Sequence, residues 1–256
     1  MINSLGLRGN LPKKGKKIIC ALGDSFTESW GAPSDSTYPA IWQHLIPTPD
    51  SLTVINAGVS GSDPFYEFNL LQELTKEYTV HAAVFMINES DINDYIWRGG
   101  NGRFLPHGGV RFRNGPWWEP FYAVSMVFRL IVHDVCGIGW SLMRQEEEQK
   151  IKQEAAKTIA AHFQQVVLPY CKARHIIPIV ILQPILADLT QKSVNYKLLQ
   201  DAFADVALPQ CYYLITDAEK WLDPQKMYWP KDGHFTPLGY TTVAHLIHQN
   251  IGKELY

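Results

Sequence analysis

The chain has 256 residues, of which 46% are hydrophobic and 19% are charged. This length is enough to bury one large core, and α/β chains of this size often form a single domain. The formal net charge of −2 gives no electrostatic reason to expect a nucleic-acid partner, and none is predicted.

The first residues lack the apolar core of a signal peptide. The apolar stretch 121–142 is interrupted by Arg129, His133 and Asp134, so no membrane-spanning segment is predicted. We expect the chain as given to be soluble and cytoplasmic, or exported if an N-terminal anchor has been trimmed. The four cysteines form no CxxC pair, so neither a zinc knuckle nor a thioredoxin-type site is indicated.

Apolar runs alternate with helical patterns along the chain. In order, strands are predicted at 17–23, 52–57, 81–88, 176–183 and 211–217, and helices at 38–45, 64–77, 145–171, 194–206 and 237–251. Short strands that are apolar on both faces and separated by helices are typical of a parallel sheet with helices on both faces. The sequence therefore predicts one α/β domain over residues 1–256.

One segment interrupts the alternation. Residues 96–115 are rich in glycine, arginine and aromatic residues and show no periodicity. Long loops of this kind are usually functional. We interpret residues 96–144 as an irregular or helical insertion that forms a lid.

Polar residues follow the first three strands, at the edge where α/β sheets bind ligands. Ser25 comes directly after the first strand, Gly61 lies in the loop after the second, and Asn88 and Ser90 follow the third. A serine hydroxyl there is a candidate nucleophile if a base removes its proton. The alternative is that Asp24 or Ser25 only caps the next helix.

A candidate base lies near the C-terminus, in the segment Asp232-Gly233-His234. In an extended segment, residues two apart point the same way, so the carboxylate and the imidazole are expected to meet. A carboxylate on one ring nitrogen leaves the other free to accept a proton from Ser25. The alternative is a solvated surface loop before the last helix.

These segments together resemble the SGNH (GDSL-type) hydrolase family. GDSFTE at 23–28 is similar to its first block, NAGVSG at 56–61 to its second and DGHFTPLGY at 232–240 to its last, and the resemblance spans nearly the whole chain. It implies a flavodoxin-like three-layer sandwich with a five-stranded parallel sheet in the order 2-1-3-4-5.

The resemblance also implies a serine esterase or acylhydrolase. In that family's scheme Ser25 is the nucleophile, His234 the base and Asp232 the triad acid. The backbone N–H groups of Ser25 and Gly61 contribute to the oxyanion hole. No cofactor or metal is implied, and the expected substrate is a small-molecule ester or an acylated glycan.

Two positions depart from the family pattern. Ser90 stands where the family has the asparagine that completes the oxyanion hole, and Asn88, two residues earlier, is the alternative donor. The acid at Asp232 lies two residues before His234, whereas many members place it three before, where this chain has Lys231.

Three other functions stay open at this stage. The first is a metal-dependent phosphohydrolase with Asp24, Asp91, Asp232 and His234 as ligands. The second is a carbohydrate O-acetyltransferase that uses the same acyl-enzyme, with aromatic residues stacking on sugar rings. The third is a catalytically degenerate binding domain on the same scaffold. Candidate stacking residues for the second are Trp97, Trp117 and Trp118.

Overall fold

The fold is described from a computed structural model. It covers residues 2–12, 15–47, 51–111, 115–139, 145–191, 194–208, 211–213, 223–252 and 255–256.

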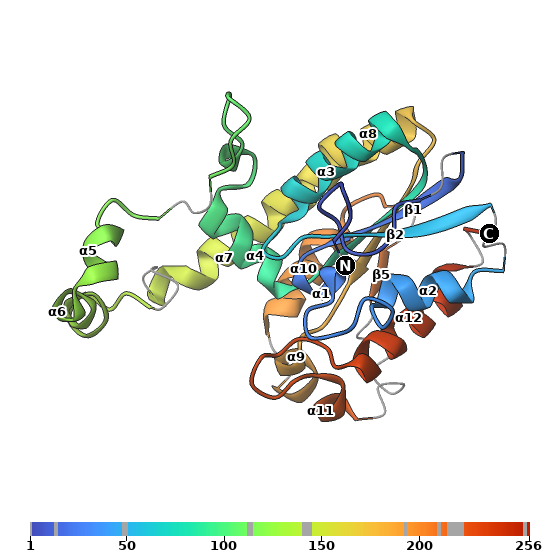
Figure 1. Cartoon of the computed structure of the whole chain (residues 1–256). Helices are drawn as coiled ribbons and strands as arrows, with labels where there is room; N and C mark the ends of the chain where they lie inside the picture. Colours follow the sequence, from blue (N-terminus) through green and yellow to red (C-terminus); the bar gives the residue numbers. More distant parts are fainter. Residues whose placement is uncertain are drawn as a thin grey trace.

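A parallel β-sheet forms the centre of the molecule (Figure 1). Its order is β2-β1-β3-β4-β5, and each neighbouring pair of strands is parallel. The strands are β1 (Lys17–Gly23), β2 (Leu52–Gly58), β3 (Thr79–Ile87), β4 (Ile177–Leu182) and β5 (Cys211–Tyr213). The predicted α/β class and parallel sheet are confirmed. Of the predicted last strand, residues 211–213 form β5, and residues 214–217 lie outside the described part.

Side chains alternate between the two faces of each strand, as the pleat requires. In β1, Ile18, Cys20 and Leu22 enter one apolar core, and Ile19 and Ala21 enter the other. The first core is covered by α3 (Pro64–Glu77), α7 (Gln145–His162) and α10 (Val194–Ala204), and the second by α2 (Tyr38–Leu45) and α12 (Pro237–Ile251). Helices therefore cover both faces of the sheet, as the alternation of the sequence predicts. The long pattern at 145–171 continues beyond α7 through η3 (Phe163–Val167) and α8 (Leu168–Ala173).

The helices that directly follow strands mark the carboxyl edge of the sheet. α1 (Ser25–Glu28), α4 (Glu89–Arg98) and α9 (Leu186–Gln191) follow β1, β3 and β4 and lie toward the same side of the molecule (Figure 1). The short helix α11 (Pro224–Met227) lies beside α9. The polar residues that follow the strands are thereby gathered at one edge.

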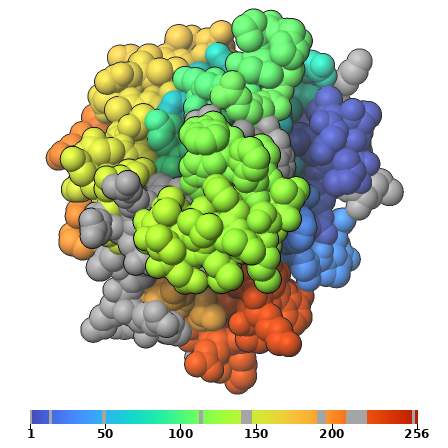
Figure 2. Space-filling view, turned by 90° about the vertical axis from the view of Figure 1, so that its left-hand side faces the viewer, coloured from blue at the N-terminus to red at the C-terminus, as the bar shows by residue number. Residues whose placement is uncertain are grey.

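The insertion forms an arm on this same side, and part of it is helical. It contains η1 (Gly100–Arg103), α5 (Glu119–Val124), α6 (Met126–Leu130) and η2 (Ile131–Val135). Residues 96–98, expected to be irregular, instead end α4, where Arg98 pairs with Asp94 at 3.1 Å. The arm projects from the body in Figure 1 and lies foremost in Figure 2. Its role as a lid stays a prediction.

Within the described residues, no helix combines the length and apolar composition needed to span a bilayer. Cys20 and Cys171 are buried free thiols, and Cys136 is an exposed one. The side chain of Cys211 lies outside the described part of the structure.

Candidate active site

Ser25 is the first residue of α1, directly after β1. Asp24 caps this helix: its Oδ1 accepts a hydrogen bond from the backbone N–H of Phe26 at 2.9 Å. The capping function that was the alternative for this segment therefore falls to Asp24, which is buried. The hydroxyl of Ser25 instead meets the imidazole of His234.

Three side chains form a continuous hydrogen-bonded chain at the edge of the sheet. Ser25 Oγ lies 2.7 Å from His234 Nε2, and His234 Nδ1 lies 2.8 Å from Asp232 Oδ1. These distances lie within the range expected for a nucleophile and its base. The fold thus joins residues that are 209 positions apart in the sequence.

The backbone conformation that brings Asp232 against His234 differs from the predicted one. An extended segment was predicted, but Gly233 has a left-handed φ of +80° and the segment is a turn. Two backbone hydrogen bonds close this turn, from Trp229 N to His234 O and from Gly233 N to Trp229 O, each 2.8 Å long. A glycine supplies the positive φ without steric cost.

Aromatic rings pack against the imidazole of His234. The ring of Phe26 lies 4.9 Å from the imidazole of His234 and 5.1 Å from the ring of Phe235, centroid to centroid. Phe235 is fully buried and its backbone bridges to Tyr228. The imidazole is therefore held between α1 and the turn that carries it.

Two backbone N–H groups remain as candidates to bind an oxyanion. Those of Ser25 and Gly61 donate to no acceptor within the described part of the chain. Gly61 has a φ of +67°, and a Cβ there would collide with the guanidinium of Arg98. The left-handed backbone conformation therefore favours glycine at this position, whereas the end of the Arg98 side chain can move aside.

Asn88 and Ser90, the two candidates for the third donor, have different surroundings. Asn88 is fully buried as the N-cap of α4, and its amide contacts Ser90 N at 2.8 Å and Asp24 Oδ2 at 3.1 Å. Ser90 borders the pocket beside Ser25. Its Oγ lies 2.6 Å from both Asp24 Oδ2 and Asn88 Oδ1, so one of these acceptors takes its single proton.

Several buried carboxyl groups lie close to Asp24, the residue before Ser25. Asp24, Glu67 and Asp91 are each at most 1% exposed. Burial, followed by the charge of Asp24, raises the pKa of both Glu67 and Asp91 well above the usual carboxyl range. Burial also raises the pKa of Asp94 to about 6. Desolvation therefore favours the neutral forms of Glu67, Asp91 and Asp94.

The arrangement of these carboxyl groups does not favour the metal-ligand set considered from the sequence. Asp91 accepts a hydrogen bond from the backbone N–H of Asn88 at 2.8 Å, and Asp232 is bonded to His234. Within the described residues, no group of three or more histidine, cysteine, aspartate or glutamate side chains is placed to hold a metal ion.

The pocket at the triad has a volume of about 530 Å³. One wall is apolar, formed by Phe26 and by residues 185–187 at the start of α9; Ser25, Ser90 and the turn 232–234 form the other. No described residue of the arm lines it. Pockets of this size and polarity are typical of small-molecule sites.

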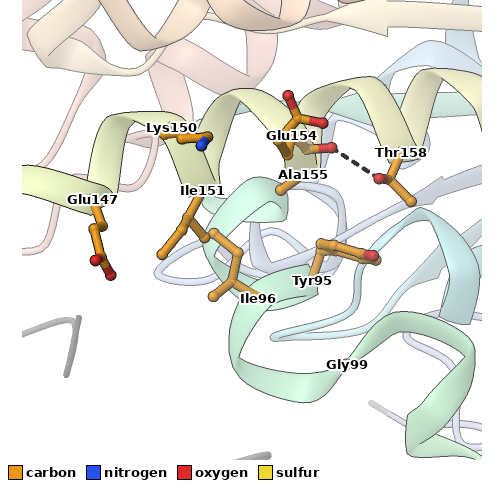
Figure 3. Close-up of a pocket in the computed structure, with 9 residues that line it drawn as sticks. All are labelled: Tyr95, Ile96, Gly99, Glu147, Lys150, Ile151, Glu154, Ala155 and Thr158. Atoms are coloured by element: carbon orange, nitrogen blue, oxygen red, sulfur yellow. Dashed lines mark hydrogen bonds between the residues drawn. The ribbon is translucent and has the colours of Figure 1, made fainter. Parts of the chain in front are cut away.

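A second and larger groove, of about 610 Å³, lies between α4 and α7 (Figure 3). Tyr95 and Ile96 line it from α4, and Ile151 and Glu154 line it from α7. None of the site residues predicted from the sequence borders this groove, and it offers no nucleophile beside a base. The smaller pocket is therefore the candidate active site.

Sequence reasoning missed Arg8, in the segment before β1. Its guanidinium donates to the carbonyl oxygens of Glu28 at 2.9 Å and Ser29 at 2.6 Å, and also to that of Ala32. Arg8 thus holds the backbone of residues 28–32, which follow Ser25 in the chain. The spacing between Arg8 and Ser25 in the sequence gives no signal for this contact.

Comparison with known proteins shows similarity in structure only. No protein-family model matches the chain, and no curated protein sequence matches it. A member of the lipolytic G-D-S-L family from Veillonella parvula DSM 2008 is 12% identical, with a TM-score of 0.51 over 93% of this chain and 99% of that one. The chain has the fold of the GDSL-type (SGNH) hydrolases.

Two esterases share this fold. The psychrotrophic esterase EstA from Pseudoalteromonas sp., in a structure inhibited by monoethylphosphonate, is 12% identical with a TM-score of 0.51, covering 94% of this chain and 99% of EstA. The two-domain esterase CEX, active on acetylated mannans, is 14% identical with a TM-score of 0.51. That match covers 93% of this chain and 49% of CEX. The predicted resemblance to the GDSL-type hydrolases and the predicted α/β fold with a parallel sheet are thereby confirmed.

Proposed function

We propose that the protein is a serine esterase that cleaves acyl esters through an acyl-enzyme on Ser25. The observation that carries this proposal is the continuous chain Ser25–His234–Asp232, with distances of 2.7 and 2.8 Å. This chain lies beside a pocket of about 530 Å³ on the fold that known GDSL esterases share.

The reaction begins when His234 Nε2 takes the proton from Ser25 Oγ as this oxygen attacks the ester carbonyl. Asp232 holds the other ring nitrogen and stabilises the imidazolium that forms. The oxyanion of the tetrahedral intermediate accepts hydrogen bonds from the backbone N–H groups of Ser25 and Gly61. His234 then gives its proton to the departing alkoxide. Water, activated by the same imidazole, hydrolyses the acyl-enzyme.

The apolar wall formed by Phe26 and residues 185–187 suits the acyl part of the substrate. A short or medium-length acyl chain fits a pocket of this volume.

The proposal is tested by turnover of acetyl, butyryl and octanoyl esters, with and without EDTA. We expect hydrolysis of the shorter esters that EDTA does not affect. Loss of all activity in EDTA, restored by a divalent cation, would instead favour the metal-dependent phosphohydrolase. A protein with no turnover that still binds esters would favour the degenerate binding domain.

Ser90→Ala is expected to lower kcat less than about tenfold, because the proton of Ser90 is already given to Asp24 or Asn88. Steady-state kinetics on an acetyl ester measures this effect, with Ser60→Ala in the neighbouring exposed loop as the control. A loss of about 10²–10³ in kcat would make Ser90 a third oxyanion donor.

Asp232→Asn is expected to lower kcat about 10²-fold, since the amide favours the wrong tautomer of His234. The effect is expected to be smaller than for a buried triad acid, because the Asp232 side chain is 49% exposed and water substitutes in part. The same kinetic assay measures the change, and Asp201→Asn, an exposed position on α10, is the matched control. Unchanged turnover in Asp232→Asn would exclude this residue as the triad acid.

A second candidate is transfer of the acyl group to a carbohydrate hydroxyl. Both reactions pass through the same acyl-enzyme and differ only in whether water or a sugar attacks it. The activity of CEX on acetylated mannans favours a glycan on one side of the ester. Product analysis with and without an oligosaccharide acceptor separates the two.

A further inference from the structure

Two tryptophans that the proposed mechanism does not use border the turn that carries the base. Trp30 is 50% exposed and Trp229 is 41% exposed. The indole of Trp30 is stacked on the imidazole of His234, with centroids 6.0 Å apart and planes inclined by 25°. Trp229 is joined to the same turn through its backbone, which exchanges hydrogen bonds with Gly233 and His234.

The backbone of this region is firmly held although the two rings are exposed. Trp30 N donates to Ser25 O at 3.1 Å, and Trp30 O accepts from the hydroxyl of Tyr240 at 3.0 Å. A Cβ on Gly31 would lie 2.9 Å from Nε1 of Trp229, so this indole lies directly against the residue that follows Trp30. Both exposed indoles therefore belong to one surface region, formed by residues 30–31 and the turn 229–234, whose backbone is held by hydrogen bonds.

This surface is separate from the acyl pocket. Neither tryptophan lines the cavity that contains Ile185 and Leu186, yet both surfaces border His234. In the proposed reaction, His234 donates its proton to the departing alcohol, so the alcohol part of the ester must lie beside the imidazole. The acyl chain thus lies in the pocket lined by Phe26 and residues 185–187, and the alcohol part lies on the side of His234 where the two indoles are.

We propose that Trp30 and Trp229 bind the sugar ring that carries the ester, which makes the substrate an acylated carbohydrate. This inference rests on the proposed esterase function. A pyranose ring presents a flat face of C–H groups that packs on an indole, while its hydroxyls stay at the edge, in water or near Nε1 of Trp229. A long-chain alcohol would instead require an enclosed apolar channel beside His234, which these half-exposed rings do not form.

The test compares two esters with the same acyl group, an acetylated manno-oligosaccharide and ethyl acetate. Trp229→Ala and Trp30→Ala are each expected to lower kcat/KM about 10-fold or more on the oligosaccharide, chiefly through KM. Hydrolysis of ethyl acetate is expected to change less than about twofold, because its alcohol is too small to reach the indoles. Phe121→Ala, an exposed aromatic residue of α5 on the arm, is the control and is expected to change neither.

An equal loss on both esters would overturn the proposal and assign the tryptophans to positioning His234. Unchanged oligosaccharide hydrolysis in both variants would also overturn it. Calorimetric binding of the acetylated oligosaccharide to Ser25→Ala separates the site from the chemistry. Binding that is lost on adding Trp229→Ala supports the sugar site even if turnover is absent, whereas no binding to Ser25→Ala contradicts it.

Discussion

Ser25→Ala and His234→Ala are each expected to reduce kcat on an acetyl ester by at least about 10⁴-fold. Without the hydroxyl no acyl-enzyme forms, and without the imidazole Ser25 Oγ loses the proton acceptor that lies 2.7 Å away. The double variant is expected to lose little more than either single variant, because the two side chains act as one unit. Steady-state kinetics, together with circular dichroism to verify folding, measures the effect.

Ser36→Ala provides the control for Ser25→Ala. Ser36 is partly exposed and its hydroxyl donates to the neighbouring Asp35 at 3.0 Å, so its substitution is expected to leave kcat unchanged. If Ser25→Ala and His234→Ala fold normally and keep wild-type turnover, the nucleophile and base are assigned wrongly.

Among glycine-to-alanine substitutions near the site, Gly58→Ala is expected to lower the free energy of unfolding the most. Gly58 ends β2, and a Cβ there would lie 2.5 Å from the carbonyl carbon of Thr27 and 2.8 Å from Cα of Glu28. These are backbone atoms of α1, which cannot move away without displacing Ser25. We expect a loss of about 3 kcal/mol or more in the free energy of unfolding, with loss of turnover.

Gly102→Ala is the matched control, because no atom lies within 4 Å of the Cβ position at Gly102. Its free energy of unfolding is expected to change by no more than about 0.5 kcal/mol. Urea unfolding of both variants measures the difference. A Gly58→Ala protein as stable and as active as Gly102→Ala would contradict the close packing of α1 on the end of β2.

The strands and helices of the body were largely predictable because their signals are local. β1 and α2 run over the residues that the apolar runs predict, since a cap or a turn marks each end. Thr37 caps α2 through its side chain, and Asp63 does the same for α3. Of the predicted last strand, only residues 211–213 are described, and they form β5.

The candidate site was predicted where chemistry selects the residue type, as at Ser25 and His234. The left-handed turn at Gly233 was missed, because an extended segment brings Asp232 to the same side of the chain equally well. The burial of Asn88 was also missed, because the local sequence does not show whether an asparagine side chain caps a helix or faces a pocket. Trp30 and Trp229 lie five residues from Ser25 and His234, and that proximity was the only signal for them.

Covalent labelling tests the central claim most directly. The intact protein is treated with a fluorophosphonate ester, and the adduct is located by peptide mass spectrometry. We predict one phosphonyl group on Ser25, no adduct in Ser25→Ala and much slower labelling in His234→Ala. An adduct on another residue, or no adduct under conditions that label a control serine hydrolase, would contradict the assignment of Ser25 as an activated nucleophile.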